Sequence, residues 1–482
     1  MTMLLNLIFV LLSVWPFTSA PKPYGPVPTK EQIRWQQMEM AMFCHYGAYS
    51  FYEGRQPNIR IEDIFYPIDL DCDQWCKVAK EAGLKGIILT ARHHVGLCLW
   101  PNPGANHSIA TSRWMKGKGD VLRALNKACK RNNIKFGIYL SPWEPGDPRY
   151  GTDEYNDLFI STLENILLNY GPVYEVWLDG YNGSDPDRIM QDFDWKRIVK
   201  TIKRIQPKTL IYSDMGPDIR WVGNEMGSGG RTNWSTLNID DYKYGDGHAP
   251  LDSLYKGNIH GANWVPAEAP VSIRPSWSWK KTEDNQLKSL QQLLNIYYET
   301  VGRNTFLLLN VPPNSTGHIS AVDSLRLVEF SDALNKIFSN NLAVGSKVTS
   351  HVISGVRQGQ NADRGRAFKA QNIIEKKDNK YWATYDDVTS ASIEIEFPEE
   401  RTFNRIMLQE NIKLGQRIVD FKIDALIDGE WVGIAGETTI GYKRIVLTPV
   451  TTAKGVRIRI LKSLASPTIK TIGVYYDNIL IK

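Results

Sequence analysis

Apolar runs of strand length alternate with amphipathic segments of helix length from about residue 30 to residue 340. The short runs rich in Ile, Leu and Val predict strands at 42–47, 85–94, 134–142, 173–180, 209–214 and 304–313. The segments between them predict helices at 73–83, 119–133, 153–171, 186–207, 285–302 and 320–340. Continuous apolar strands separated by helices are typical of a parallel sheet that is covered on both faces.

A doubly wound open sheet and a closed barrel both fit this alternation. The unit has the usual size of a barrel, and no GxGxxG or GxxxxGK[ST] motif follows the first predicted strand. Polar or ionisable residues recur at the carboxyl ends of the predicted strands, at His45, His93, Asp179 and Asp214. We therefore expect an α/β domain, a (β/α)8-like barrel over residues 21–342.

The pattern changes near residue 340, where helical periodicity ends. Strand-like runs with turn signals between them follow at 392–398, 403–411, 421–435, 443–450, 454–463 and 471–478. This spacing predicts an all-β sandwich of antiparallel strands over residues 343–482.

The first twenty residues have the features of a targeting segment. Leu4–Trp15 is apolar but too short to span a bilayer comfortably, and Thr18, Ser19 and Ala20 suit signal-peptidase cleavage. We expect a signal peptide over 1–20 and a secreted or periplasmic protein; an uncleaved anchor is the alternative, because no Lys or Arg precedes the apolar run. No Cys follows the run, so a bacterial lipoprotein is not expected, and no later segment has the pattern of a membrane span.

Charge and cysteine usage exclude some classes of function. The formal net charge of +5 on 482 residues includes no dense block of Lys or Arg, so a nucleic-acid partner is not expected. The five cysteines lie early in the chain and lack metal-site spacing, and we expect buried thiols, with one disulfide among them as the alternative. They are Cys44, Cys72, Cys76, Cys98 and Cys129. We predict neither a metal nor a cofactor.

The strand VYEVWLDG carries the first candidate for chemistry. Residues 175, 177 and 179 point to the same side of a strand, so Asp179 would lie at the carboxyl rim of a barrel with Trp177 one layer below. A rim carboxylate beside an aromatic residue is a plausible nucleophile. A helix cap or a loop-stabilising Asp is the alternative, and the strand pattern alone favours neither.

Three histidines end the first two predicted strands. His93 and His94 are adjacent and point to opposite faces of a strand, which disfavours a shared metal ion. Hydrogen bonding of neutral imidazoles to sugar hydroxyls fits better for these two and for His45, and structural histidines are the alternative.

The second carboxylate is less certain from the pattern. Glu225 lies in the glycine-rich stretch RWVGNEMGSGG, where Trp221 could desolvate it and raise its pKa, as a general acid requires. Glu268 in WVPAEAPVSIRPSW is a rival, and a structural surface Glu is the alternative for either. A retaining glycosidase needs two such carboxyl groups about 5 Å apart.

At these motifs the chain resembles glycoside hydrolase family 29, the retaining α-L-fucosidases. The matching strings are FCHYGAYS, GIILTARHHVGLCLWPN, KFGIYLSPWE, EVWLDG and GRNTFLLLNVPPNSTGHI, in the order of the family. The strings RWVGNE and SIRPSW are similar to the subgroup that prefers α-1,3/1,4-linked fucose. The resemblance implies release of terminal L-fucose by double displacement, with fucosylated oligosaccharides or glycoconjugates as partners.

The resemblance also implies roles for individual residues. Asp179 matches the nucleophile, and Glu225 matches the acid/base. The residues expected to hold or line the fucose site are His45, His93, His94, Tyr139, Trp143, Trp221 and Trp277, with Trp279 as a competitor of Trp277. Two departures are that Glu62 is a poor match for the glutamate of the family's first loop and that RPSWSWKK differs from the subgroup's usual RPGW.

Alternatives to this function remain open from the sequence. They are a glycosidase of the same barrel type acting on another sugar such as galactose, and a non-catalytic glycan-binding protein. The C-terminal sandwich is similar to discoidin or galactose-binding-like modules, so calcium or a sugar is a candidate ligand of that domain.

Overall fold

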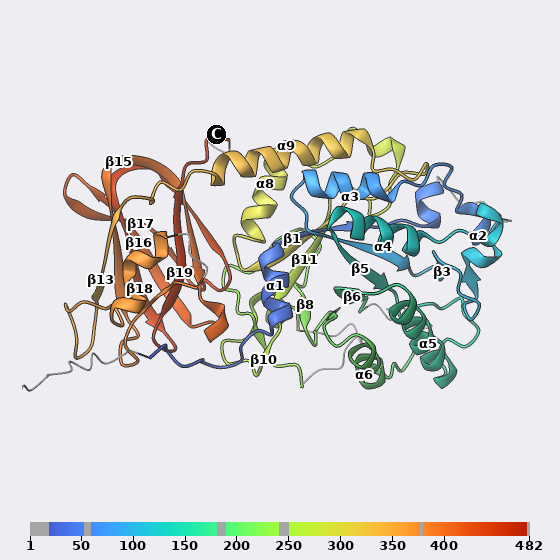
Figure 1. Ribbon diagram of the computed structural model, residues 1–482, viewed down its shortest axis with the longest axis horizontal. Helices are drawn as coiled ribbons and strands as arrows, with labels where there is room; N and C mark the ends of the chain where they lie inside the picture. Colours follow the sequence, from blue (N-terminus) through green and yellow to red (C-terminus); the bar gives the residue numbers. More distant parts are fainter. Residues whose placement is uncertain (1–18, 53–58, 181–188, 241–249, 376–378, 480–482) are drawn as a thin grey trace, which may run out of the picture.

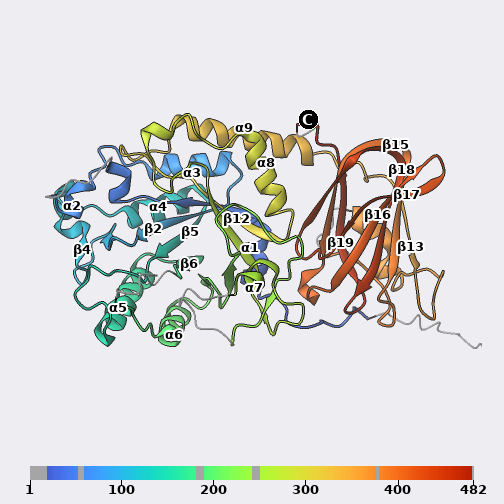
Figure 2. The same cartoon turned by 180° about the vertical axis from the view of Figure 1, so that it is seen from behind.

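The computed structural model describes residues 19–52, 59–180, 189–240, 250–375 and 379–479. The predicted signal peptide lies outside these residues except for Ser19 and Ala20, which are exposed. Two domains lie side by side, with a barrel from blue to yellow and a sheet domain in orange and red (Figures 1 and 2). The fold class expected from the sequence, a (β/α)8-like barrel followed by an all-β domain, is confirmed.

Eight strands close the barrel in the order β1-β12-β11-β8-β7-β6-β5-β2, and every neighbouring pair is parallel. They are β1 (Met40–Cys44), β2 (Gly86–Arg92), β5 (Lys135–Leu140), β6 (Glu175–Leu178), β7 (Leu210–Ser213), β8 (Ile219–Trp221), β11 (Ala267–Ser272) and β12 (Thr305–Asn310). Parallel closure brings all eight carboxyl ends to one rim, where barrel enzymes build their sites.

Helices cover the outside of the barrel. The longer ones are α1 (Lys30–Met38), α3 (Cys72–Glu81), α4 (Val121–Asn132), α5 (Asp153–Asn169), α6 (Trp195–Ile205), α8 (Leu290–Glu299) and α9 (Ala321–Phe338). Short helices α2 (Ile61–Ile64) and α7 (Leu251–Lys256) lie in the connections. None of the helices in the described part of the chain is both long and apolar enough to cross a membrane.

Two helices begin later than their apolar pattern predicts, because capping residues fix their first turns. The described part of 186–207 becomes helical only at Trp195, where Asp194 accepts a hydrogen bond from the backbone of Arg197. In 285–302 the helix starts at Leu290, after Ser289 forms a capping box with Gln292. A side-chain cap satisfies backbone N–H groups that the first turn leaves free, so it sets where a helix starts.

The cysteines are buried in the barrel domain as free thiols, so the alternative of a disulfide is wrong. The sulfur atoms of Cys76 and Cys129 are 3.8 Å apart, between α3 and α4. The side chains therefore serve as small apolar groups in the layer between helices and sheet.

The C-terminal domain is a seven-stranded antiparallel sheet that folds around its own apolar core. Its strands are β13 (Lys347–Val352), β14 (Trp382–Ala383), β15 (Ala391–Glu410), β16 (Ile418–Ile427), β17 (Glu430–Glu437), β18 (Arg444–Ser463) and β19 (Thr468–Tyr475). The long strands β15 and β18 pair over most of their length and carry register shifts at Glu396/Arg401 and Phe403/Arg405. Irregularities of this kind bend a strand, which lets one sheet enclose both sides of a core.

Candidate active site

Asp179 follows β6 directly and lies on the wall of a cavity of about 350 Å³ at the carboxyl rim. Glu225, from the loop after β8, lines the same cavity. The remaining lining residues are His94, Trp177, Gly180, Tyr212, Asp214, Trp221, Leu251 and Pro270. The two carboxyl groups that the sequence singles out therefore face one space.

Tyr139 holds the carboxylate of Asp179, and His94 lies close to the same group. The hydroxyl of Tyr139, which is 1% exposed, donates to Asp179 Oδ2 at 2.8 Å, and His94 Nε2 lies 3.7 Å from the same oxygen. The Tyr139 ring stacks on Trp177 with centroids 5.1 Å apart. A hydrogen bond to a carboxylate from a ring fixed by stacking orients the oxygen that could attack a substrate.

His45 is oriented by Asn310 at the end of β12. Asn310 Oδ1 lies 2.9 Å from His45 Nδ1, while its amide nitrogen donates to Ser272 Oγ and to the carbonyl of Trp277. These contacts place the proton of the neutral ring on Nδ1 and leave Nε2 as an acceptor. Burial lowers the pKa of His45 to about 3, so the ring is neutral at physiological pH.

His93 and His94 are neutral for the same reason. Burial lowers the pKa of both; the charge of Asp179 opposes that effect at His94. His93 lies 5.5 Å from the ring of Tyr139, almost parallel to it, and 5.4 Å from the ring of His45. Three uncharged imidazoles beside an aromatic surface can exchange hydrogen bonds with hydroxyl groups without binding a proton.

Trp277 and Trp143 lie beside the histidines, but they are not among the described residues that line the cavity. The ring of Trp277 lies 4.9 Å from that of His45, and the ring of Trp143 lies 5.1 Å from that of His94. The competitor Trp279 lies instead against the guanidinium of Arg274. Sequence order alone could not separate Trp277 from Trp279.

Glu225 lies on a tightly folded loop at the edge of the cavity, where its side chain is only partly removed from water. Trp221 donates its indole N–H to the carbonyl of Asn224 at 3.1 Å, and Asn224 donates to the carbonyl of Ser228 at 2.8 Å. Burial raises the pKa of Glu225 and the negative charge of Asp179 adds to this, whereas a hydrogen bond with Trp277 lowers it. A carboxyl group that keeps its proton near a carboxylate can serve as a general acid.

The glycines of this loop are required by close packing. Gly227 has φ 75°, a conformation that favours glycine, and a side chain at Gly230 would place its Cβ 2.4 Å from the carbonyl oxygen of Tyr255. Arg220 in β8 is fully buried and donates to the carbonyls of Leu254 and Trp234. The loop that carries Glu225 is thus held at both ends.

The C-terminal domain contacts the chain just beyond this loop. The backbone N–H of Asn233 donates to Thr439 Oγ1 at 2.8 Å, and that of Ser235 donates to Gln416 Oε1 at 2.7 Å. Gln416 Nε2 donates back to the carbonyl of Asn233 at 2.9 Å. The second domain therefore stabilises a segment that starts a few residues after Glu225.

Glu268 lies inside the barrel and not on the cavity. It is completely buried in β11, where its Oε1 accepts the indole N–H of Trp177 at 2.9 Å. Glu175 lies beside it and accepts the indole N–H of Trp35 at 2.9 Å. Burial is the main cause that raises the pKa of both groups, to about 8 for Glu175, so this pair belongs to the core and Glu268 is no rival of Glu225.

Glu62 and Arg92 lie outside the residues that line the cavity, as expected for Glu62, which is a poor match for the family's first-loop glutamate. Glu62 lies in α2 and contacts His107 and Thr111, away from the cavity. Arg92, one residue before His93, forms a buried ion pair with Glu144 at 2.7 Å and donates to the carbonyl of Ser141. Nothing in the sequence singles out Arg92 as a functional residue. Only the structure shows that it pairs with Glu144 next to the histidines in the chain.

Two comparisons of the sequence agree with this geometry. Residues 35–337 match the family model described as Alpha-L-fucosidase, and residues 354–471 match the F5/8 type C domain. The chain is 39% identical to Alpha-L-fucosidase 1 of Arabidopsis thaliana, an alignment covering 95% of this chain and 89% of the plant protein.

The chain belongs to the alpha-L-fucosidase family. It is therefore a glycoside hydrolase, and the rim cavity, which both carboxyl groups line, is the candidate site for hydrolysis of the glycosidic bond.

A solved structure of the alpha-L-fucosidase family has the same two-domain organisation. The structure of a Ruminococcus gnavus fucosidase of glycoside hydrolase family 29, in complex with fucose, matches with a TM-score of 0.84 and 31% identity. The match covers 96% of this chain and 97% of the other.

Proposed function

We propose that this alpha-L-fucosidase releases terminal L-fucose from glycans by double displacement with net retention. In the first step Asp179 attacks the anomeric carbon while Glu225 protonates the leaving oxygen, which gives a β-linked fucosyl-enzyme. In the second step Glu225, now ionised, takes a proton from water, and the water displaces Asp179. The observation that supports the proposal most is that both carboxyl groups line one cavity.

The electrostatics of the pair support this division of roles. Asp179 receives the hydroxyl hydrogen bond of Tyr139, which fixes the orientation of the oxygen that attacks. Glu225 has a raised pKa because of burial and the nearby negative charge, which favours the protonated form. Two carboxyl groups whose environments differ in this way suit a nucleophile and a general acid.

The neutral histidines and Trp277 are proposed to bind the sugar. His45 offers Nε2 as an acceptor, and His94 lies between Ser141 and Asp179, where it could contact a hydroxyl near the reacting carbon. Tyr139, Trp143 and Trp221 would shape the walls.

Azide rescue tests the two roles separately. In Asp179→Gly, azide can attack an activated α-L-fucoside directly, so the expected product is the β-fucosyl azide. In Glu225→Ala, azide attacks the covalent intermediate, so the expected product is the α-fucosyl azide. An α-azide from the Asp179 variant, or wild-type turnover in either variant without azide, would overturn the assignment.

We further propose a preference for α-1,3/1,4-linked fucose. This rests on the RWVGNE and SIRPSW strings and on the position of Trp221 at the cavity, beside Glu225. Digestion of Lewis-type trisaccharides and of 2'-fucosyllactose by the same preparation tests it. Faster cleavage of 2'-fucosyllactose would contradict the linkage preference while leaving the fucosidase reaction intact.

The apolar segment 1–20 supports export as a proposal for the location of the protein. Expression of the full chain in a secreting host, followed by N-terminal sequencing, would test it. A mature chain that begins at Pro21 is the expected result, and retention of Met1 in the cell would contradict it.

A further inference from the structure

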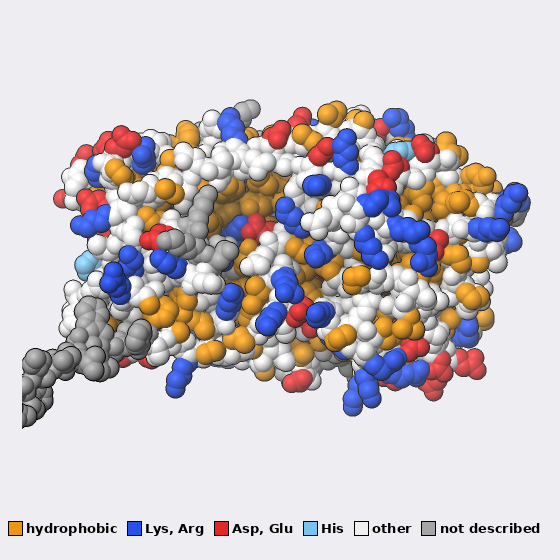
Figure 3. Space-filling model, viewed as in Figure 1, with side chains coloured by type: hydrophobic (Ala, Val, Ile, Leu, Met, Phe, Trp, Pro, Cys, Tyr) orange, Lys and Arg blue, Asp and Glu red, His pale blue; other side chains and the backbone are white. Residues whose placement is uncertain are grey.

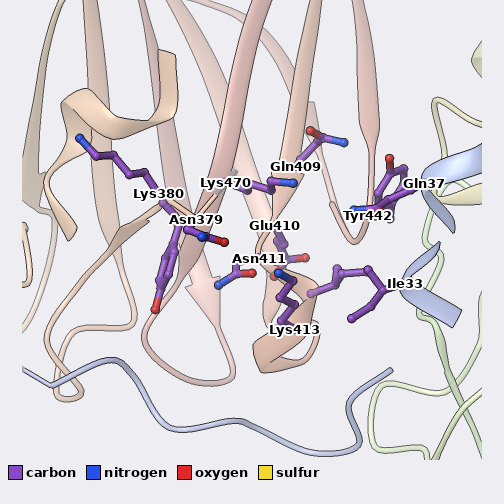
Figure 4. A pocket seen from close by; sticks show the side chains of 12 residues that line it. Ile33, Gln37, Asn379, Lys380, Gln409, Glu410, Asn411, Lys413, Tyr442 and Lys470 are labelled. Atoms are coloured by element: carbon purple, nitrogen blue, oxygen red, sulfur yellow. The ribbon is translucent and has the colours of Figure 1, made fainter. Parts of the chain in front are cut away.

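A second polar cavity of about 170 Å³ lies where α1 meets the C-terminal domain (Figure 4). Figure 3 shows a recess on the same face of the molecule, between the two domains. Tyr442 lines the cavity and donates its backbone N–H to Asn304 Oδ1, directly before β12 begins. The cavity thus lies near the amino ends of the barrel strands, whereas Asp179 lies at the carboxyl ends, so the two sites are separate.

The side chains around this cavity are mostly amides, lysines and tyrosines. They are Gln37, Asn379, Lys380, Tyr381, Gln409, Glu410, Asn411, Lys413, Tyr442 and Lys470, with Ile33 and Ile412 as the apolar members. Amide groups and aromatic faces are groups that proteins use to bind sugars. The volume of the cavity equals that of about five or six water molecules, which is enough for one sugar ring.

Asn411 provides the most specific sign of a ligand. It is 9% exposed, and no side-chain hydrogen bond of its amide is present among the described residues. Figure 4 shows the amide turned into the cavity. The amide atoms stay accessible from the cavity, so a ligand or a water molecule there can supply their hydrogen bonds.

The lysines give the cavity a positive charge. Within the part of the chain that the structure describes, Lys413 and Lys470 have no acidic partner within 4 Å, and Figure 4 shows their amino groups on the same side as the amide of Asn411. Lys380 extends away from the centre and pairs with Glu375.

Glu410 does not neutralise these two lysines. Its carboxylate at the base of the cavity already accepts three backbone N–H groups, from Arg417 at 2.8 Å, Ile418 at 3.1 Å and Gly441 at 2.7 Å. Its role is to hold the strand ends together. The two free ammonium groups are therefore left for a negatively charged group.

We propose that this cavity binds an acidic sugar residue, one that carries a carboxylate or a sulfate. Lys413 and Lys470 pair with the acidic group, and Asn411 exchanges hydrogen bonds with the ring hydroxyls. Such a site would hold the enzyme on acidic glycans while the rim cavity acts on fucose.

The binding test uses the full chain and three matched probes, 3'-sialyllactose, lactose 3'-sulfate and neutral lactose, in titration calorimetry at low salt. None of them carries fucose, so the result does not depend on the reaction at Asp179. We expect one or both acidic probes to bind about tenfold more tightly than lactose, and the two arms distinguish carboxylate from sulfate. Equal binding of all three probes, or no binding, would overturn the proposal.

Charge-matched variants locate the site. The double variant Lys413→Gln/Lys470→Gln should weaken binding of the acidic probe about tenfold, and Asn411→Ala should weaken it severalfold. The double variant should hydrolyse an aryl α-L-fucoside at the wild-type rate, which shows that it is folded. As a control, Lys462→Gln removes an exposed charge of β18 and should bind normally. Unchanged binding by the double variant, or equal loss in the control, would refute the assignment to this cavity.

Discussion

The buried pair Glu175 and Glu268 makes a quantitative prediction about stability. Both carboxyl groups lie inside the barrel, each accepts one indole N–H, and burial raises the pKa of both. Glu268→Gln keeps the acceptor for Trp177 and supplies an N–H toward Glu175, so it mimics a Glu268 that is permanently protonated. The substitution should remove part of the pH dependence of unfolding.

The sign follows from the direction of the pKa change. An unfolded glutamate has a pKa of about 4.3 and is ionised at pH 7, whereas burial raises the folded pKa of Glu175 to about 8 and also raises that of Glu268. Unfolding then releases protons, so the stability from this pair is fully present below the unfolded pKa and is lost as the pH rises toward the folded pKa. The free energy of unfolding falls by up to about 1.4 kcal/mol per pH unit for each proton held, or about 3 kcal/mol between pH 5 and pH 7.

Urea unfolding of the wild type and of Glu268→Gln at pH 5, 6, 7 and 8 measures this effect. The two proteins should have similar stability at pH 5, and the variant should become the more stable one, by on the order of 1–3 kcal/mol, by pH 8. Glu430→Gln, in an exposed position of β17, is the matched control and should follow the wild type. Parallel pH curves for wild type and Glu268→Gln would refute the reasoning.

Three further predictions concern the reaction. Tyr139→Phe removes a hydrogen bond to a carboxylate worth about 1.5–3 kcal/mol, so kcat/KM should fall about 10- to 100-fold while circular dichroism stays unchanged; a full rate would show that the contact with Asp179 has no catalytic use. Trp277→Phe removes the hydrogen bond that lowers the pKa of Glu225, so the alkaline limb of the kcat/KM profile should move to higher pH, and a shift to lower pH would contradict this. Gln416→Ala breaks two hydrogen bonds across the domain boundary, and both the unfolding free energy, by about 1–3 kcal/mol, and kcat should decrease; normal kcat in a destabilised variant would show that the second domain does not position the loop.

Six of the eight barrel strands could be predicted from the sequence, and the two others could not. Strand β11 contains Pro270 and the buried Glu268, and β8 is short and contains the buried Arg220. Proline and charged residues argue against a central strand, and only closure of the barrel and partners far along the chain make them acceptable. In the C-terminal domain the predicted runs 392–398 and 403–411 form the single strand β15, and 443–450 and 454–463 form β18, because both strands continue through register shifts; β13 and β14 were not predicted.

The sequence could predict those rim residues that lie on a strand, because the alternation of side chains along a strand fixes which face each one points to. Asp179 lies at the end of a strand with a clear pattern, and its position follows from the alternation of side chains. Glu225 lies in a loop whose shape depends on Arg220 and on contacts with the C-terminal domain, so its approach to Asp179 is a property of the whole fold. The exclusion of Glu268 likewise needed the structure, since β11 was not recognisable as a strand.

Trapping of the fucosyl-enzyme tests the central claim most directly. Incubation with 2-deoxy-2-fluoro-L-fucosyl fluoride slows both chemical steps and favours accumulation of the intermediate, and peptide mass spectrometry then locates the modified residue. The account predicts a single fluorofucosyl adduct on the peptide that contains Asp179, with no adduct in Asp179→Asn. An adduct on Glu225, or complete turnover to an inverted product without any adduct, would contradict it.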